Sequence, residues 1–137
     1  MPHEKVNDMK WTEAYATGSN EVDEQHKTLF LMSEQFRETL DAGHGEGTYD
    51  LFIEFLSTYA MTHFSYEEDC MLAHLCPAAD RNKVEHCNFT QFIDQEVERF
   101  RRDGFDRTVA YNLLDTIDQW LDSHIGKVDV QLKTVMP

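Results

Sequence analysis

The chain has few cysteines, little positive charge and no long apolar run, and each shortage excludes a class of protein. Its 137 residues contain three cysteines, an odd number that fits a reduced compartment better than a disulfide framework. Twelve Lys+Arg against 26 Asp+Glu give a net charge of −14, which repels nucleic-acid phosphates and anionic lipid headgroups. No apolar run approaches bilayer-spanning length, and residues 1–5 lack the start of a secretion signal. Composition therefore predicts a cytoplasmic protein that binds neither nucleic acid nor membranes.

Helical periodicity dominates the sequence. Apolar residues recur three and four positions apart in four segments, and no segment shows strand-like alternation of useful length. Asn20 is a plausible N-cap of the first segment, Pro77 prevents continuation of the second, and Gly104 follows the third. Short connections favour antiparallel neighbours, so we expect an all-α, up-down-up-down four-helix bundle that forms a single domain over 1–137. The expected parts are an extended N-terminal arm at 1–19 and helices at about 20–42, 48–75, 80–103 and 106–132.

Six metal-capable side chains interrupt the apolar faces of these predicted helices. Since the helices alternate in direction, all six fall towards the same end of the bundle, within a few turns of one another. Buried His and carboxylate groups are costly without partners, a metal ion supplies several partners at once, and no basic residue lies on these faces. The sequence therefore predicts a buried metal centre. Its candidate ligands are His26, His63, Glu67, His86, His124 and Asp129.

The spacing of two ligand pairs differs. His63 and Glu67, at i and i+4, share one helix face and can reach a common ion. His124 and Asp129, at i and i+5, do not align on a regular helix. We therefore expect local widening of the helix there, or a carboxylate that reaches sideways.

Simpler interpretations apply to the other candidate ligands. A single His on an apolar face is more often a hydrogen-bonded core residue than a ligand, and the convergence of six groups reverses that preference. His3, His44 and His74 are expected to be structural, at the terminus, in the glycine loop and at a helix end. The cysteines are expected to be structural thiols. A zinc site is a weak alternative, because its spacings do not match paired-ligand patterns. It would use His74, Cys76, His86 and Cys87.

Several segments together resemble the hemerythrin family, specifically the bacterial hemerythrin domain. Trp11 and Tyr15 resemble the aromatic lead-in segment of that family. The resemblance covers nearly the whole chain. It implies a four-helix bundle that holds two iron ions bridged by an oxo or hydroxo group, with O2 bound end-on at an open position of one iron. The matching segments are D-E-Q-H at 23–26, H-F-S-Y-E-E at 63–68, Pro77, H-C-N-F at 86–89 and H-I-G-K-V-D at 124–129.

The resemblance also implies a role for each matching residue. Glu67 and Asp129 would bridge the two irons. His26 and His63 would bind the iron that keeps the open position, and His86 and His124 would bind the other. Three further residues correspond to apolar residues of the O2 pocket, although without the resemblance they would simply be core. They are Trp120, Leu121 and Ile125.

The chain departs from the family at Asn82, where the family has a histidine. The amide oxygen of asparagine is a weaker iron ligand than imidazole. Either this oxygen binds the second iron, or water takes the position, or the site has decayed. We expect a more exposed second iron that oxidises rapidly. Cys76 also replaces a tyrosine usual before the proline, a smaller departure.

The expected function is an oxygen or redox sensor module with rapid autoxidation, and not an enzyme. Alternatives are an O2 carrier or storage protein, a di-iron oxidoreductase acting on O2, peroxide or nitric oxide, and a metal site for iron storage or structure alone. The Glu-x-x-His pairs of ferritin-like oxidases are absent. Iron follows from the resemblance, since these ligands also suit manganese or zinc. The chain ends at Pro137, so it would be either a complete small protein or part of a protein with a signalling output domain.

Overall fold

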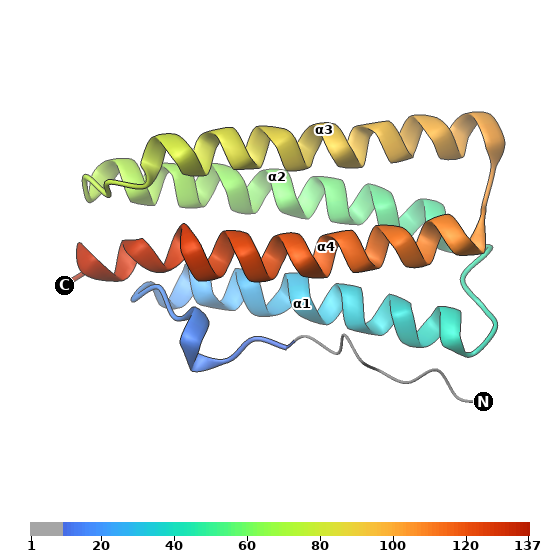
Figure 1. The fold of residues 1–137 in the computed structure, drawn as a ribbon, viewed down its shortest axis with the longest axis horizontal. Coiled ribbons are helices and arrows are strands. Elements are labelled where there is room, and N and C mark those ends of the chain that lie inside the picture. The colour runs from blue at the N-terminus through green and yellow to red at the C-terminus, as the bar shows by residue number, and fades with distance from the viewer. Residues whose placement is uncertain (1–9) are drawn as a thin grey trace.

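Four long antiparallel helices lie side by side in the computed structural model, which describes residues 10–137 (Figure 1). This confirms the predicted all-α four-helix bundle, and no strand occurs among the described residues. Part of the predicted arm 1–19, and His3 with it, lies outside them, while the remainder carries a 3-10 turn, η1 (Glu13–Tyr15). The long helices are α1 (Asn20–Asp41), α2 (Tyr49–Ala73), α3 (Ala79–Asp103) and α4 (Arg107–Lys127).

Side-chain caps and glycines define the helix ends. Ser19, and not Asn20, is the N-cap of α1, and its hydroxyl accepts a hydrogen bond from the backbone N–H of Val22. Asp106 caps α4 in the same way, accepting from the N–H of Val109 at 3.0 Å. Gly104 follows α3 with φ of +81°, a conformation that glycine adopts without steric cost. These local signals account for the starts of α1 and α4 and for the end of α3, whereas α2 and α3 begin without a side-chain cap.

The fourth helix does not continue to residue 132 as predicted. α4 ends at Lys127, Val128 has φ of −108°, and a 3-10 helix, η2, covers Asp129–Thr134. The helix therefore tightens after His124, because a 3-10 helix has fewer residues per turn than an α-helix. The expected widening is wrong, and the change of helix type gives Asp129 a direction that a regular α-helix would not give it.

A polar layer divides the core into two apolar clusters. The larger cluster extends from Leu29 on α1 through the middle of the bundle, and the smaller one lies beyond the polar layer near the α2–α3 turn. His26 separates Val22 from Leu29 on α1, and His124 separates Leu121 from Val128 on α4. On both helices a histidine interrupts the apolar face, and the two interruptions lie at the same level of the bundle. The smaller cluster consists of Val22, Met71, Cys76, Ala78, Val128 and Leu132.

A second buried polar group joins α1 to α4 and was not predicted. Nη2 of Arg37 donates to Oδ2 of Asp118 at 3.0 Å and to Oδ1 of Asp115 at 2.9 Å, and Ser33 donates to Asp118. The pair neutralises its own charge, so it needs no metal ion.

Within residues 10–137, no helix combines the length and the apolar character needed to cross a lipid bilayer.

Candidate metal centre

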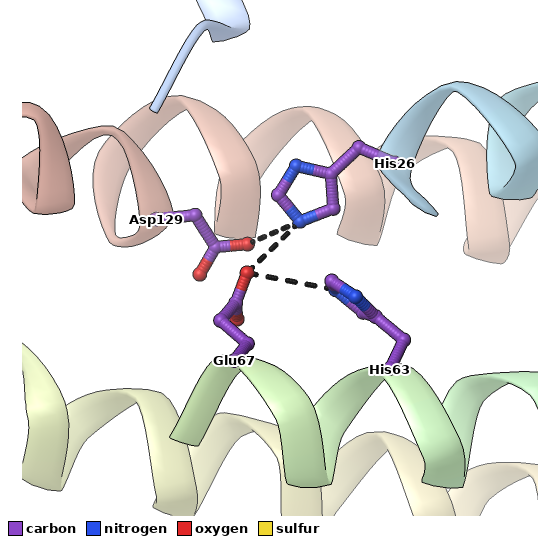
Figure 2. Close-up of side chains that lie close together, drawn as sticks. All are labelled: His26, His63, Glu67 and Asp129. Atoms are coloured by element: carbon purple, nitrogen blue, oxygen red, sulfur yellow. Dashed lines mark hydrogen bonds and ion pairs between the residues drawn. The ribbon is translucent and has the colours of Figure 1, made fainter. Parts of the chain in front are cut away.

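The first group of ligand atoms comes from α1, α2 and η2 (Figure 2). Nε2 of His26 lies 3.0 Å from Oε2 of Glu67 and 3.1 Å from Oδ2 of Asp129. Nε2 of His63 lies 3.5 Å from the same Glu67 oxygen. One ligand atom from each of the four residues lies within 4.8 Å of all the others, and all four side chains are buried. This spacing suits one metal ion.

The second group uses the same two carboxylates with the other two histidines. Nε2 of His86 lies 3.1 Å from Oε1 of Glu67, and Nε2 of His124 lies 2.9 Å from Oδ1 of Asp129. The two Nε2 atoms are 3.1 Å apart. These four ligand atoms also lie within 4.8 Å of one another. The structure therefore brings together all six predicted ligands and divides them into two overlapping sites.

Each carboxylate divides its two oxygens between the histidine pairs. Oε2 of Glu67 and Oδ2 of Asp129 face the pair His26 and His63, whereas Oε1 and Oδ1 face the pair His86 and His124. A carboxylate in this position can bridge two cations, with one oxygen on each. The arrangement follows from helix geometry, because His63 and Glu67 share a face of α2 and the start of η2 turns Asp129 towards it.

The two carboxylates favour the protonated form of two of the histidines. Burial opposes a positive charge on His26, but the adjacent carboxylates of Asp129 and Glu67 outweigh it and raise the pKa of His26 to about 9. Burial likewise opposes charge on His124, whereas Asp129 and Glu67 raise its pKa to about 10. Burial without such strong compensation lowers the pKa of His63 to about 3. Positive charge, whether from protons or metal, is therefore needed to balance the two carboxylates.

The donor set fits metal ions. Oδ2 of Asp129 is buried and has no hydrogen-bond partner among the described residues, and Nε2 of His26 lies 3.1 Å from it. No Lys or Arg forms an ion pair with Glu67 or Asp129 in residues 10–137. Imidazole nitrogens and carboxylate oxygens are common ligands of iron, manganese and zinc. A cation would satisfy Oδ2 and supply the missing positive charge.

Asn82 is buried beside the second group. With its nitrogen turned inward, its amide lies 2.9 Å from Nε2 of His86, Nε2 of His124 and Oε1 of Glu67, and 3.1 Å from Oδ1 of Asp129. An amide nitrogen has only two hydrogens for these four neighbours. The same position would let an amide oxygen join the other ligand atoms of this group. Asn82 thus extends the second group and leaves the first unchanged.

The outer nitrogens of three histidines have partners that the sequence analysis missed. Nδ1 of His63 lies 2.6 Å from Oε1 of Gln25, Nδ1 of His86 lies 3.0 Å from Oε2 of Glu68, and Nδ1 of His124 lies 2.7 Å from Oε1 of Glu85. Nδ1 of His26 is buried and has no partner in the described part of the chain. Each partner adjoins a candidate ligand in the sequence, and this adjacency was the available signal. Each of these partners supports a histidine on the next helix along the chain.

The three predicted pocket residues lie on α4 and differ in environment. Leu121 and Ile125 are fully buried in the larger core cluster. Trp120 is half-buried and stacks on the ring of His124, with centroids 4.3 Å apart. Phe64, which was not predicted as a site residue, stacks on His86 at 3.8 Å. Apolar side chains therefore adjoin the histidines of the second group, and the role of the pocket residues stays a prediction.

The alternative zinc ligands do not converge. In the part of the chain that the structure describes, no group of metal-capable atoms includes a cysteine. Cys87 is exposed, and Nδ1 of His74 lies 2.9 Å from the backbone oxygen of Cys70. His44 is exposed in the turn after α1. These residues therefore have local positions that need no metal.

Comparisons with known proteins give consistent similarities. The model of the hemerythrin HHE cation binding domain matches residues 17–135. A hemerythrin-like protein of Naegleria gruberi is 28% identical over 127 residues, which is 92% of each chain. A bacteriohemerythrin of Clostridium acetobutylicum is 26% identical over 126 residues, covering 87% of this chain and 94% of the relative. A crystal structure of wild-type hemerythrin has a TM-score of 0.77 and 26% identity, covering 93% of this chain and 97% of that one.

Proposed function

Because the chain belongs to the hemerythrin family, we propose that its buried cluster holds two iron ions and that the domain binds O2. The observation that carries the proposal is the division of each carboxylate, Glu67 and Asp129, between two histidine pairs. The donor set alone suits several metals, and the family supports iron. When bound, ferrous ions would supply the electrons on which reversible O2 binding depends.

The number of donors differs between the two ions. His26, His63 and one oxygen from each carboxylate give the first ion four donors. The second ion receives the same number from His86, His124 and the carboxylates, and the oxygen of Asn82 would add a fifth. Neutral imidazoles complete the coordination without adding charge, while the carboxylates offset part of the charge of the ions. The first ion, with one donor fewer than the second, would be the one with room for O2 as a further ligand.

We assign the apolar wall to Leu121 and Ile125, which are buried in the larger core cluster. Such a wall limits the entry of water and protects the reduced state of a metal site. Trp120 would act through its stacking on His124. In this assignment, the chain's own residues hold the ions, orient the imidazoles and exclude solvent.

Within this function, Asn82 favours a sensor over a carrier. An amide oxygen binds iron less strongly than imidazole, so the second ion would have two imidazole ligands and no third, and would oxidise rapidly. A domain that changes redox state on contact with O2 suits oxygen or redox sensing. The signalling partner, the cytoplasmic location and the absence of enzymatic activity stay predictions. Turnover of O2, peroxide or nitric oxide with a reductant would favour an oxidoreductase instead.

The first experiment is the visible spectrum of anaerobic, iron-loaded protein before and after O2 is admitted, with iron per chain measured on the same sample. We expect two irons per chain and rapid conversion to an oxidised spectrum. A charge-transfer band that persists after O2 is admitted would favour a carrier. Fewer than two irons per chain would contradict the di-iron centre.

A further inference from the structure

The supports behind the four histidines differ between the two groups. In the second group, His86 and His124 each face a carboxylate, at 3.0 Å from Glu68 and 2.7 Å from Glu85. In the first group, His63 faces the neutral amide of Gln25, and Nδ1 of His26 has no partner among the described residues. The negative charge is therefore placed only behind the group that contains Asn82.

The supports follow a regular path around the bundle. Gln25 on α1 contacts His63 on α2, Glu68 on α2 contacts His86 on α3, and the third contact joins Glu85 on α3 to His124 on α4. No support returns from α4 to His26 on α1 in the described chain, so the ring is open at that step. Each helix thus fixes the imidazole of the next one.

A carboxylate behind a metal-binding imidazole has two effects. It accepts a hydrogen bond from Nδ1–H, which fixes the tautomer so that the lone pair of Nε2 points at the metal, and it makes the imidazole a stronger donor. Arg81 lies 2.8 Å from Glu85 and holds this support in turn. Phe64 and Trp120 stack on the same two imidazoles. His86 and His124 are therefore fixed both at the ring edge and at the ring face.

We propose that Glu68 and Glu85 are positioning residues that hold the second cation and compensate for the histidine that Asn82 replaces. This inference rests on the proposed two-ion centre and adds the residues that make its weaker half bind. Glu68 and Glu85 do not touch the cation themselves, because they contact the outer nitrogens of the histidines. Their negative charges stabilise a cation bound at the second position.

The test is an anaerobic ferrous-ion titration of the metal-free full chain, comparing wild type with Glu68→Gln, Glu85→Gln and the double variant. We expect wild type to bind two ions and each single variant to bind one of the two more weakly by about 10- to 100-fold, with a larger loss in the double variant. Both carboxylates are about a quarter exposed, so the amide variants should keep the fold, which helical circular dichroism checks. If Glu68 and Glu85 only stabilised the fold, the two substitutions would weaken the binding of both ions equally.

Three controls make the result specific. Asp69→Asn removes an exposed carboxylate from the same helix as Glu68, and Asp94→Asn removes an exposed carboxylate from the same helix as Glu85. Both should bind two ions with affinities close to wild type. Adding Asn82→His to the double variant should restore the affinity for the ion that binds more weakly. The reason is that the only histidines Asn82 contacts are those of the second group, His86 and His124.

The outcomes separate this inference from the proposed function. Wild type with fewer than two ions would overturn both. Wild type with two ions, together with a double variant that also binds two at unchanged affinity, would overturn the inference alone. A loss that falls on both ions, or one that Asn82→His does not restore, would also contradict it.

Discussion

At the position of Asn82, one side chain decides how many nitrogen donors a cation in the second group would receive. Its amide lies 2.9 Å from Nε2 of both His86 and His124, so a side chain from this position reaches the same point as the other ligand atoms. A histidine here would add an imidazole, and the buried environment would hold it in place.

Replacing Asn82 with histidine should prolong the oxygenated state. The added imidazole binds the second ion more strongly and fills the position that an amide or water otherwise occupies. We expect a lifetime longer by on the order of tenfold, measured by stopped-flow absorbance after O2 is mixed with the reduced protein. Asn88→His adds a histidine at an exposed position of α3 and is the matched control. An unchanged or shorter lifetime in Asn82→His would contradict the role given to Asn82.

The convergence of the six candidate ligands could be predicted from the sequence, whereas the contacts behind them could not. His26 and His124 interrupt apolar faces, and the bundle topology places those interruptions at one level, so a local pattern carried the information. Gln25, Glu68 and Glu85 lie beside the ligands, where polar residues normally face solvent. Their contacts with a neighbouring helix depend on side-chain directions that only the assembled bundle fixes.

At the scale of helices, α1 and α4 are joined by a buried ion pair far from the metal centre. Arg37 contacts Asp118 and Asp115, and Ser33 donates to Asp118 at 2.6 Å. Burial raises the pKa of Asp118 even though these hydrogen bonds favour its charged form. The sequence analysis missed this pair because its members are 81 residues apart and each looks like an ordinary surface charge.

Replacing Arg37 with methionine should destabilise the bundle. The substitution keeps the length of the side chain but leaves Asp118 buried without its cation, and such a loss costs about 3 kcal/mol. Chemical denaturation of the metal-free variant would measure the change in the free energy of unfolding. Arg102→Met removes an exposed pair with Asp103 on the same bundle and should change stability by less than about 0.5 kcal/mol. Equal losses in the two variants would contradict a special role for the buried pair.

The helix boundaries show the same division between local and non-local causes. The helix ends predicted from Gly104 and Pro77 are correct, because each of these residues determines the conformation of its own backbone. The end of α4 at Lys127 was not predicted, since residues up to Leu132 keep a helical spacing of apolar side chains. The change to a 3-10 helix is instead linked to the position that Asp129 takes in the polar layer.

For the whole molecule, a metal ion in the proposed centre would compete with protons for the same nitrogens. The raised pKa values of His26, about 9, and His124, about 10, mean that the folded metal-free chain binds these protons more tightly than the unfolded chain does. This contribution to stability is fully present below the ordinary histidine pKa and is lost as pH rises through 9 to 10. Metal ions at the Nε2 atoms would displace the protons.

The metal-free chain should therefore lose stability between pH 7 and pH 9.5, by on the order of 3 kcal/mol, while the iron-loaded chain should change less. Urea denaturation at both pH values, with and without metal, measures the difference. Metal binding at pH 7 should also release protons, which calorimetry in buffers of different ionisation enthalpy detects. A metal-free chain whose stability rises over this pH range would contradict the assignment of protons to His26 and His124.

The order in which the chain supplies its ligands has a consequence for synthesis. Asp129 follows all the other ligands in the sequence, and its two oxygens face both histidine pairs. While a ribosome is still making α4, a nascent chain can offer Glu67 and the first histidines but cannot close either ion site. In the proposed di-iron centre, iron would therefore enter after the last helix has been made and docked, and a chain that ends before residue 129 would lack the carboxylate shared by both ion sites.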